Sequence, residues 1–368
     1  MARNAIRAII SIIVLVTVAL SLPAFGKGKN FEELFSIQDT IRLPKAKTGT
    51  AMAIHRFKID KDERICLSTG PPGDSEVWFY NFQDQLAYLV RDEDIGPIRG
   101  YPYVYFKALA FGRNSETYIS ESVSGKVAVI DTAGKFLSYF APRDDHNCRA
   151  GASDMEIDEQ GYVYLGGPCY QEADICPEAR DFCIHKYDPK GNYVRSFFPF
   201  DKGLFELVSS PSEDVHLDLD QEGNIWCVHN MVYQVFKYSP EGELLAKFPG
   251  QSSFYEPPTK FSDTESEQAR RTWQTSWSKI NNLVALEPNL ILLSLITHSP
   301  SKSVVEIYDQ DGDLLETDIQ TNHRLLGRDR QGFVYFLLDG YDKDKWSDEF
   351  RIGRFSVTST DQSKSHTR

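Results

Sequence analysis

The segment LDLDQEGNIWCV, Leu217–Val228, sets the pattern for the whole chain. Apolar and polar residues alternate up to Asp220, an Asp-x-x-Gly turn ends at Gly223, and a dense apolar run follows. Asp and Gly supply the local hydrogen bonds and the positive φ that a tight turn needs, so the segment predicts a β-hairpin.

The pattern occurs six times, and each copy begins with an apolar residue. The other copies are FKIDKDERICLS (57–68), LAFGRNSETYIS (109–120), MEIDEQGYVYLG (155–166), LVALEPNLILLS (283–294) and LGRDRQGFVYFL (326–337). A second strand–turn–strand pattern follows every copy but the last, as in VFKYSPEGELLAKF. A four-stranded antiparallel unit repeated six times predicts an all-β fold, a six-bladed β-propeller.

The last copy lacks a fourth strand, because the polar tail 358–368 follows its third strand FRIGRFSV (350–357). A spare strand, SIQDTIRLP (36–44), precedes the first copy. We expect this N-terminal strand to complete the last blade, since closing the ring removes an exposed sheet edge.

This repeat pattern, for example Asp220-Gln221-Glu222-Gly223-Asn224-Ile225-Trp226, resembles that of the six-bladed β-propellers of the NHL-repeat and related exported bacterial type. The resemblance covers about residues 36–357. Such propellers serve as platforms for proteins, peptides or ligands and, less often, as lyases and lactonases, so the resemblance does not decide function. The expected blades are 53–90, 103–141, 151–199, 214–249, 278–319 and 323–357 with the strand 36–44, all within a propeller domain 27–357. The tail 358–368 is expected to be disordered.

Residues 1–26 read as a cleaved export signal. Arg3 and Arg7 form a basic start, Ala8–Leu22 an apolar core, and Ala24-Phe25-Gly26 a small-x-small cleavage site. The alternative is a retained membrane anchor. We therefore expect a periplasmic or secreted protein, with no membrane span after cleavage. A formal net charge of −13 argues against nucleic acid as a partner.

Export places the cysteines in a compartment that permits disulfides. Four of them fall in or beside the long loops of the third blade and are predicted to form two disulfides of unassigned pairing: Cys148, Cys169, Cys176 and Cys183. A metal is the less favoured alternative, because their spacing is not that of a zinc finger or ribbon. Cys66 and Cys227 fall in second strands of opposite blades and are predicted to be buried.

One helix is predicted, within SDTESEQARRTWQTSW (262–277), where Ser262 and Glu265 form a capping-box pattern. Trp273 and Trp277 follow at helical spacing. They are candidates for a lid over the channel, although docking of the helix onto the propeller is the favoured alternative.

Insertions fall in loops that emerge on one face of the disc, which marks the expected working face. Residues four and five places before each turn should ring the channel mouth on that face. The predicted ligand-binding residues are His55, Arg56, Lys107, Asp154, His216, Asn281, Asn282 and Arg324. The cations among them suggest binding of an anionic or carboxylate-bearing group.

The sequence favours a binding module over an enzyme, with a peptide, glycan or protein as partner. No cofactor is predicted. The alternative is a metal-assisted lyase or hydrolase with its site at the mouth, for which His55, His216, His229 and His298 are weak metal candidates. The resemblance to propeller lactonases would place Asn281 and Asp154 near a calcium ion, but the cations there oppose it. The ligand, the disulfide pairing and the oligomeric state are not fixed by the sequence.

Overall fold

A computed structural model describes residues 29–44, 54–69, 76–81, 85–91, 94, 106–121, 125–143, 149–167, 169–170, 181–208, 214–262, 266–286, 289–298, 302–338 and 349–358. The export signal predicted for residues 1–26 and nearly all of the polar tail lie outside this set. None of the helices within it is long and apolar enough to cross a membrane.

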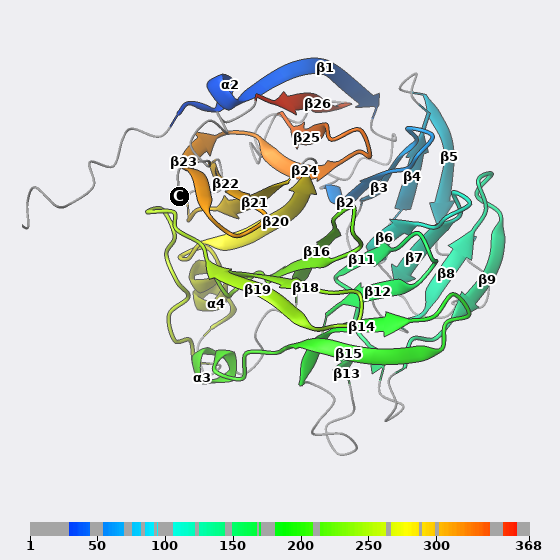
Figure 1. Cartoon of the computed structure of the whole chain (residues 1–368), viewed down its shortest axis with the longest axis horizontal. Coiled ribbons are helices and arrows are strands. Elements are labelled where there is room, and N and C mark those ends of the chain that lie inside the picture. Colours follow the sequence, from blue (N-terminus) through cyan, green and yellow to red (C-terminus); the bar gives the residue numbers. More distant parts are fainter. Residues whose placement is uncertain are drawn as a thin grey trace, which may run out of the picture.

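Six four-stranded antiparallel sheets radiate from a central axis, which confirms the predicted six-bladed β-propeller (Figure 1). From the axis outward, the first three blades contain β2 (Ile54–Ile59), β3 (Ile65–Thr69), β4 (Glu76–Tyr80) and β5 (Leu86–Arg91); β6 (Phe106–Phe111), β7 (Thr117–Glu121), β8 (Val127–Ile130) and β9 (Phe136–Phe140); and β11 (Asp154–Ile157), β12 (Val163–Gly166), β14 (Phe182–Tyr187) and β15 (Tyr193–Pro199).

The last three blades contain β16 (Val215–Leu219), β17 (Ile225–His229), β18 (Gln234–Tyr238) and β19 (Leu244–Pro249); β20 (Lys279–Leu286), β21 (Leu290–Ile296), β22 (Ser303–Asp309) and β23 (Leu314–Thr321); and β24 (Arg324–Arg328), β25 (Val334–Leu337), β26 (Glu349–Val357) and β1 (Phe35–Pro44). A small ladder joins β10 (Arg149–Ala150) to β13 (Cys169–Tyr170). The helices are α2 (Phe31–Leu34), α3 (Leu204–Leu207) and α4 (Glu267–Gln274).

The ring closes as expected, because β1 pairs antiparallel with β26 from Phe35↔Val357 to Pro44↔Glu349. Figure 1 shows β1 at the rim, outside β26. The sixth blade thus combines the two ends of the chain, and the edge of β26 is covered.

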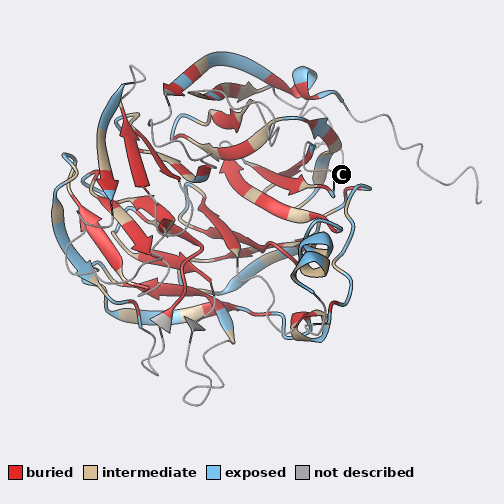
Figure 2. Ribbon diagram, turned by 180° about the vertical axis from the view of Figure 1, so that it is seen from behind, coloured by how far each residue is buried: buried red, intermediate tan, exposed pale blue. Residues whose placement is uncertain are grey.

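The rim strands are the least buried part of each blade (Figure 2). The second strands β3 and β17 are buried along their whole length, whereas at least half of the residues of β5 and β9 at the rim are exposed. Hydrophobic clusters fill the spaces between neighbouring blades, as in the cluster that joins β14 and β15 to β17. Apolar packing between blades therefore holds the inner strands in place around the channel.

The Asp of the repeated turn is a structural anchor. In blade four, Asp220 Oδ1 accepts from the backbone N–H groups of Glu222 (3.0 Å) and Asn224 (2.9 Å), and Oδ2 accepts from Trp226 Nε1 (3.1 Å). Asp158 and Asp329 bond Tyr164 and Tyr335 in the same way. Gly223 has φ +78°, as the turn pattern predicts.

Candidate functional site: the central channel

The innermost strands β2, β6, β11, β16, β20 and β24 line the channel. Each begins at the face of the long loops and ends at the turn to the second strand, here called the a–b turn. The channel therefore has two ends, the predicted mouth on the loop face and a second opening among the a–b turns.

The structure brings most of the predicted mouth residues together. A cavity of about 30 Å³ is lined by His55, Arg56, Asp154, His216, Asn281, Asn282 and Arg324, among others. Lys107 does not line it and lies half-buried on β6. A volume of this size accommodates about two water molecules. Among the residues that the structure describes, the mouth is therefore narrow and has room only for a small group.

Hydrogen bonds between blades hold the mouth closed. Arg56 Nε on blade one donates to the carbonyl oxygen of Ser153 on blade three (2.6 Å). Arg324 on blade six donates from Nη1 to the carbonyl oxygen of Ile54 (3.0 Å) and from Nε to Asn281 Oδ1 (3.0 Å). These acceptors are neutral, so the bonds fix the positions of the two guanidinium groups, while the charge of Arg56 is opposed by the carboxylate of Asp154.

His216 lies buried at this end. Burial, followed by the positive charge of Arg56, lowers its pKa to about 4, against the opposing effect of Asp154. His216 is therefore neutral at neutral pH, and the positive charge at the mouth comes from the arginines.

Five charged side chains cross the middle of the channel, and we call them the ion network: Lys58, Asp154, Glu156, Asp218 and Arg328. Lys58 Nζ bonds Glu156 and lies 3.5 Å from Asp154 Oδ1. Arg328 donates from Nε to Asp218 Oδ2 (2.8 Å) and from Nη2 to Asp218 Oδ1 (3.1 Å). These pairs join blade one to blade three and blade six to blade four, so they span the channel.

The pKa values of Asp154 and Glu156 are shifted in opposite directions. Burial would raise the pKa of Asp154, but Lys58 and Arg56 outweigh it and the pKa falls. For Glu156, burial raises the pKa to about 7, and the negative charges of Asp218 and Asp154 add to this against the attraction of Lys58. Glu156 is the carboxyl of this network that binds a proton near neutral pH.

The larger hollow lies at the other end of the channel. A cavity of about 660 Å³, here called the turn-end cavity, is lined by inner-strand residues near the a–b turns and by the a–b turns themselves. Lys58, Glu156, Asp218 and Arg328 form its base, and Lys61, Gln160, Gln221 and Arg330 stand among the turns at its rim. Its volume lies within the range of about 300–1,000 Å³ that is typical of small-molecule sites.

The residues at this end of the channel were not among the predicted site residues. Lys58, Glu156 and Asp218 each stand two places before the turn Asp, and Arg328 stands one place before it. A charged residue between an apolar strand and the turn in four of the six copies is the signal that could have found them, because residues two apart on a strand share a face.

The two predicted lid residues pack against the propeller instead of lining either cavity. Trp277 is buried in the cluster between blades three and four, and Trp273 donates from Nε1 to the carbonyl oxygen of Thr259 (2.8 Å). The helix itself is present as α4, but it starts later than predicted. Its N-cap is Ser266, whose side chain accepts from Ala269 N, in place of Ser262.

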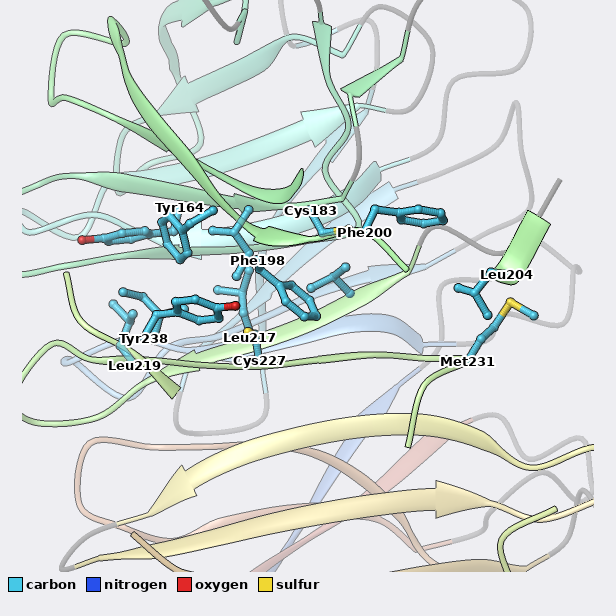
Figure 3. Close-up of a cluster of buried hydrophobic side chains, with 14 of the residues drawn as sticks. Tyr164, Cys183, Phe198, Phe200, Leu204, Leu217, Leu219, Cys227, Met231 and Tyr238 are labelled. Carbon is cyan, nitrogen blue, oxygen red and sulfur yellow. The ribbon is translucent and has the colours of Figure 1, made fainter. Parts of the chain in front are cut away.

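The cysteine predictions have a mixed outcome. Cys66 and Cys227 are buried, as predicted. Cys183 is not on the loop face: its side chain is buried with Cys227 in the same cluster (Figure 3). Cys148 and Cys176 lie outside the described residues, as does the side chain of Cys169. No disulfide is present among the side chains that the structure describes, so the predicted pairing stays a prediction.

The metal candidates do not gather at one place. His55 and His216 border the small cavity, His229 is buried at the end of β17, and His298 is exposed with Nδ1 3.2 Å from Glu256. In the described parts of the chain, no three His, Cys, Asp or Glu side chains are placed to hold one metal ion.

The oxygens expected near calcium also fit it poorly. Asn281 Oδ1 accepts from Arg324 (3.0 Å), and Asp154 Oδ2 accepts from Leu217 N (3.2 Å). A guanidinium thus lies where a cation would have to bind, and the donor set as arranged does not fit a calcium ion.

Comparison with solved structures agrees with the fold. A member of the DUF4221 family from Bacteroides vulgatus is 8% identical with a TM-score of 0.60, covering 88% of this chain and 98% of the other. The likeness is one of fold. A structure proposed to be a gluconolactonase is 11% identical with a TM-score of 0.50 (90% and 97% covered), and a streptogramin B lyase is 12% identical with a TM-score of 0.48 (90% and 100% covered).

No protein-family model matches the sequence. Curated protein sequences also give no match. The solved structures include proteins described as enzymes and proteins without a described function, and identities this low report the propeller fold alone.

Proposed function

We propose that this protein is a binding propeller that takes its ligand into the turn-end cavity of the channel and performs no covalent chemistry on it. The observation that carries the proposal is the cavity of about 660 Å³, whose base of charged side chains is fixed by ion pairs between blades. A site held rigidly before binding loses little conformational entropy when the ligand enters.

The contrast between the two channel ends supports this choice. The mouth encloses about 30 Å³ and its arginines are engaged in bonds between blades. The turn-end cavity is more than an order of magnitude larger and combines ion pairs with apolar side chains such as Ile59 and Leu219. Ligand sites combine fixed polar groups with apolar side chains, and in this cavity the polar groups form the larger part of the lining.

The loop face keeps a secondary role in the proposal. Most of its loops lie outside the described residues, so its recognition of a peptide, glycan or protein partner rests on the sequence pattern. The positive charge of Arg56 and Arg324 would favour an anionic group of such a partner at the mouth. Export to the periplasm or medium likewise rests on residues 1–26, and the mass of the mature protein, starting at Lys27, would test it.

A bulky side chain at the cavity rim tests the proposed site. Gln160 is exposed, stands at the rim, and its backbone N–H donates to Asp158 Oδ1. Ala133 occupies the same place in an outer turn, with its N–H on Asp131 Oδ1. Gln160→Trp should obstruct the cavity, whereas Ala133→Trp serves as the matched control.

The readout is the thermal shift caused by a panel of neutral sugars, carboxylates and amines at millimolar concentration. We expect at least one class to stabilise the wild type and Ala133→Trp, by about 2.7 kcal/mol at a hundredfold excess over Kd, and to lose most of this effect in Gln160→Trp. Ligands that bind all three proteins equally, or a panel without any binder, would contradict the proposed site.

A further inference from the structure

We propose that the turn-end cavity binds a cationic group on an alkyl stem, an alkylammonium or a guanidinium, which takes the place of the proton on Glu156. This inference rests on the proposed function and names the chemical class of its ligand.

The ion network holds one carboxyl group more than it holds cations. Three carboxyls, those of Asp154, Glu156 and Asp218, face the two cations Lys58 and Arg328. The other inner strands add no charge to the lining, because β6 contributes Phe111 and β20 contributes Asn282, Leu283 and nothing ionisable. Arg56 also acts on Asp154 from the mouth side, and Lys58 is shared between Asp154 and Glu156. Glu156 has no cation of its own, so it is the carboxyl that would gain from a further positive charge or a proton.

The turn aspartates at the cavity wall do not alter this balance, because each has its own cation outside the cavity. Asp60 Oδ2 lies 2.6 Å from Arg64, Asp220 Oδ2 lies 3.4 Å from Lys237, and Asp329 Oδ2 lies 3.3 Å from Arg354. Asp158 is bonded by Tyr164 and faces Lys186. Among the remaining charged residues of the lining, the two cations Lys61 and Arg330 match the two acids Glu159 and Glu222 in number. The preference of the cavity is therefore set at its base.

Glu156 is the most exposed of the three carboxyls of the network. Its side chain is 19% exposed, against 6% for Asp154, which lies deeper in the channel. Asp218 is held by two bonds from Arg328 and by the backbone N–H of Ala285 (2.9 Å). Burial and the neighbouring carboxylates raise the pKa of Glu156 to about 7, so near neutral pH a ligand cation and a proton compete for this group.

Apolar side chains in the same cavity as Glu156 fit the stem of such a ligand. Ile59, Ile157, Leu219 and Leu326 line the cavity together with Phe111. An alkyl chain would bury apolar surface against them while its charged end reaches Glu156, as Lys and Arg stems do in protein interiors. This collar favours an alkyl cation over a bare metal ion, which prefers oxygen ligands on all sides.

Isothermal titration calorimetry at pH 6 and pH 8 tests the inference. The probes are 1,5-diaminopentane and the capped peptide acetyl-Gly-Lys-Gly-amide, whose primary amines stay protonated over most of this range. A ligand that displaces a proton from a group of pKa about 7 binds about tenfold more tightly at pH 8 than at pH 6. Binding of the diamine alone would indicate a free polyamine ligand, and binding of the peptide would indicate a basic peptide.

Two variants show whether Glu156 is responsible. Glu156→Gln mimics the protonated acid and leaves Lys58 beside Asp154, so it should fold, bind the amine about tenfold more weakly at pH 8, and lose the pH dependence. Glu243→Gln makes the same charge change at an exposed outer turn and should behave as the wild type.

Three results would overturn the inference. The first is amine binding that is unchanged in Glu156→Gln, and the second is failure of both amines to bind. The third is displacement of a bound amine by calcium, together with calcium binding that is retained in Gln160→Trp. A neutral sugar or carboxylate that binds the wild type and not Gln160→Trp, with neither amine binding, would overturn the cationic ligand and leave the proposed site standing.

Discussion

Arg328 on β24 and Asp218 on β16 form a two-bond ion pair that joins blade six to blade four across the channel. Both side chains are mostly buried, at 18% and 12% exposure. Removing one member of such a pair leaves a charge that its surroundings cannot fully compensate.

We therefore expect Arg328→Met to lower the free energy of unfolding by about 3 kcal/mol. Adding Asp218→Asn should recover most of this loss, because the amide oxygen can still accept from Ala285 N while the uncompensated charge is removed. Urea unfolding of the two variants measures the difference. A loss under about 0.5 kcal/mol in Arg328→Met, the usual scale of surface substitutions, would show that the pair does not brace the channel.

Glu156 should make stability depend on pH between about 4.3 and 7. Its folded pKa of about 7 lies above the ordinary unfolded value of about 4.3, so the native state binds the extra proton in this window. Its contribution to stability is present at low pH and is lost as pH rises through 7, by an amount on the order of 3 kcal/mol. Unfolding free energies at pH 5 and pH 8 should show this loss in the wild type relative to Glu156→Gln. An identical pH dependence of the two proteins would refute the raised pKa.

His216 should act in the opposite direction. Its folded pKa of about 4 lies below the ordinary value of about 6.5, so the unfolded state takes up the proton first as pH falls. The stability that it contributes is present above pH 6.5 and is lost as pH falls towards 4. The imidazole NMR signals of His216 should shift only near pH 4, whereas those of the exposed His298 serve as a reference. A His216 midpoint near 6.5 would mean that the mouth is open to water.

Gly223 and Gly312 both lie in turns, but a side chain added at each would contact different neighbours. Gly223 has φ +78° with only an ordinary contact, 3.7 Å from an added Cβ to Pro240. Gly312 has φ +86°, and an added Cβ would lie 2.3 Å from the ring of Phe248. Gly223→Ala should cost about 1–2 kcal/mol for the backbone conformation alone, and Gly312→Ala should cost clearly more, because the buried ring must also move. Equal melting temperatures for the two variants would contradict this comparison.

The sequence predicted the fold because its signals are local. The turn Asp and Gly, the alternation up to Asp220 and the spare strand 36–44 each act through near neighbours or through one sheet edge. The channel was harder, since the pairing of Lys58 with Asp154 and Glu156 joins residues about a hundred positions apart. Counting back from the turns brought Arg56, Asp154 and His216 to one end. It could not show that bonds to the carbonyl groups of Ser153 and Ile54 close that end and leave the wider space at the other.

The raised pKa of Glu156 also could not be predicted from the sequence. In MEIDEQG it reads as one polar residue of an alternating strand. Its raised pKa arises from burial in the closed ring and from the neighbouring carboxylates of Asp218 and Asp154, against the attraction of Lys58. The position of Glu156 in its strand could therefore be predicted from the sequence, whereas its electrostatic environment could not, because it depends on closure of the ring.

A crystal structure of the protein soaked with 1,5-diaminopentane at pH 8 tests the central claim most directly. We predict density in the turn-end cavity, with an ammonium group at hydrogen-bond distance from Glu156 and the alkyl chain against Ile157 or Leu219. Density at the mouth beside Arg56 and Arg324, with the turn-end cavity containing only water, would contradict the account.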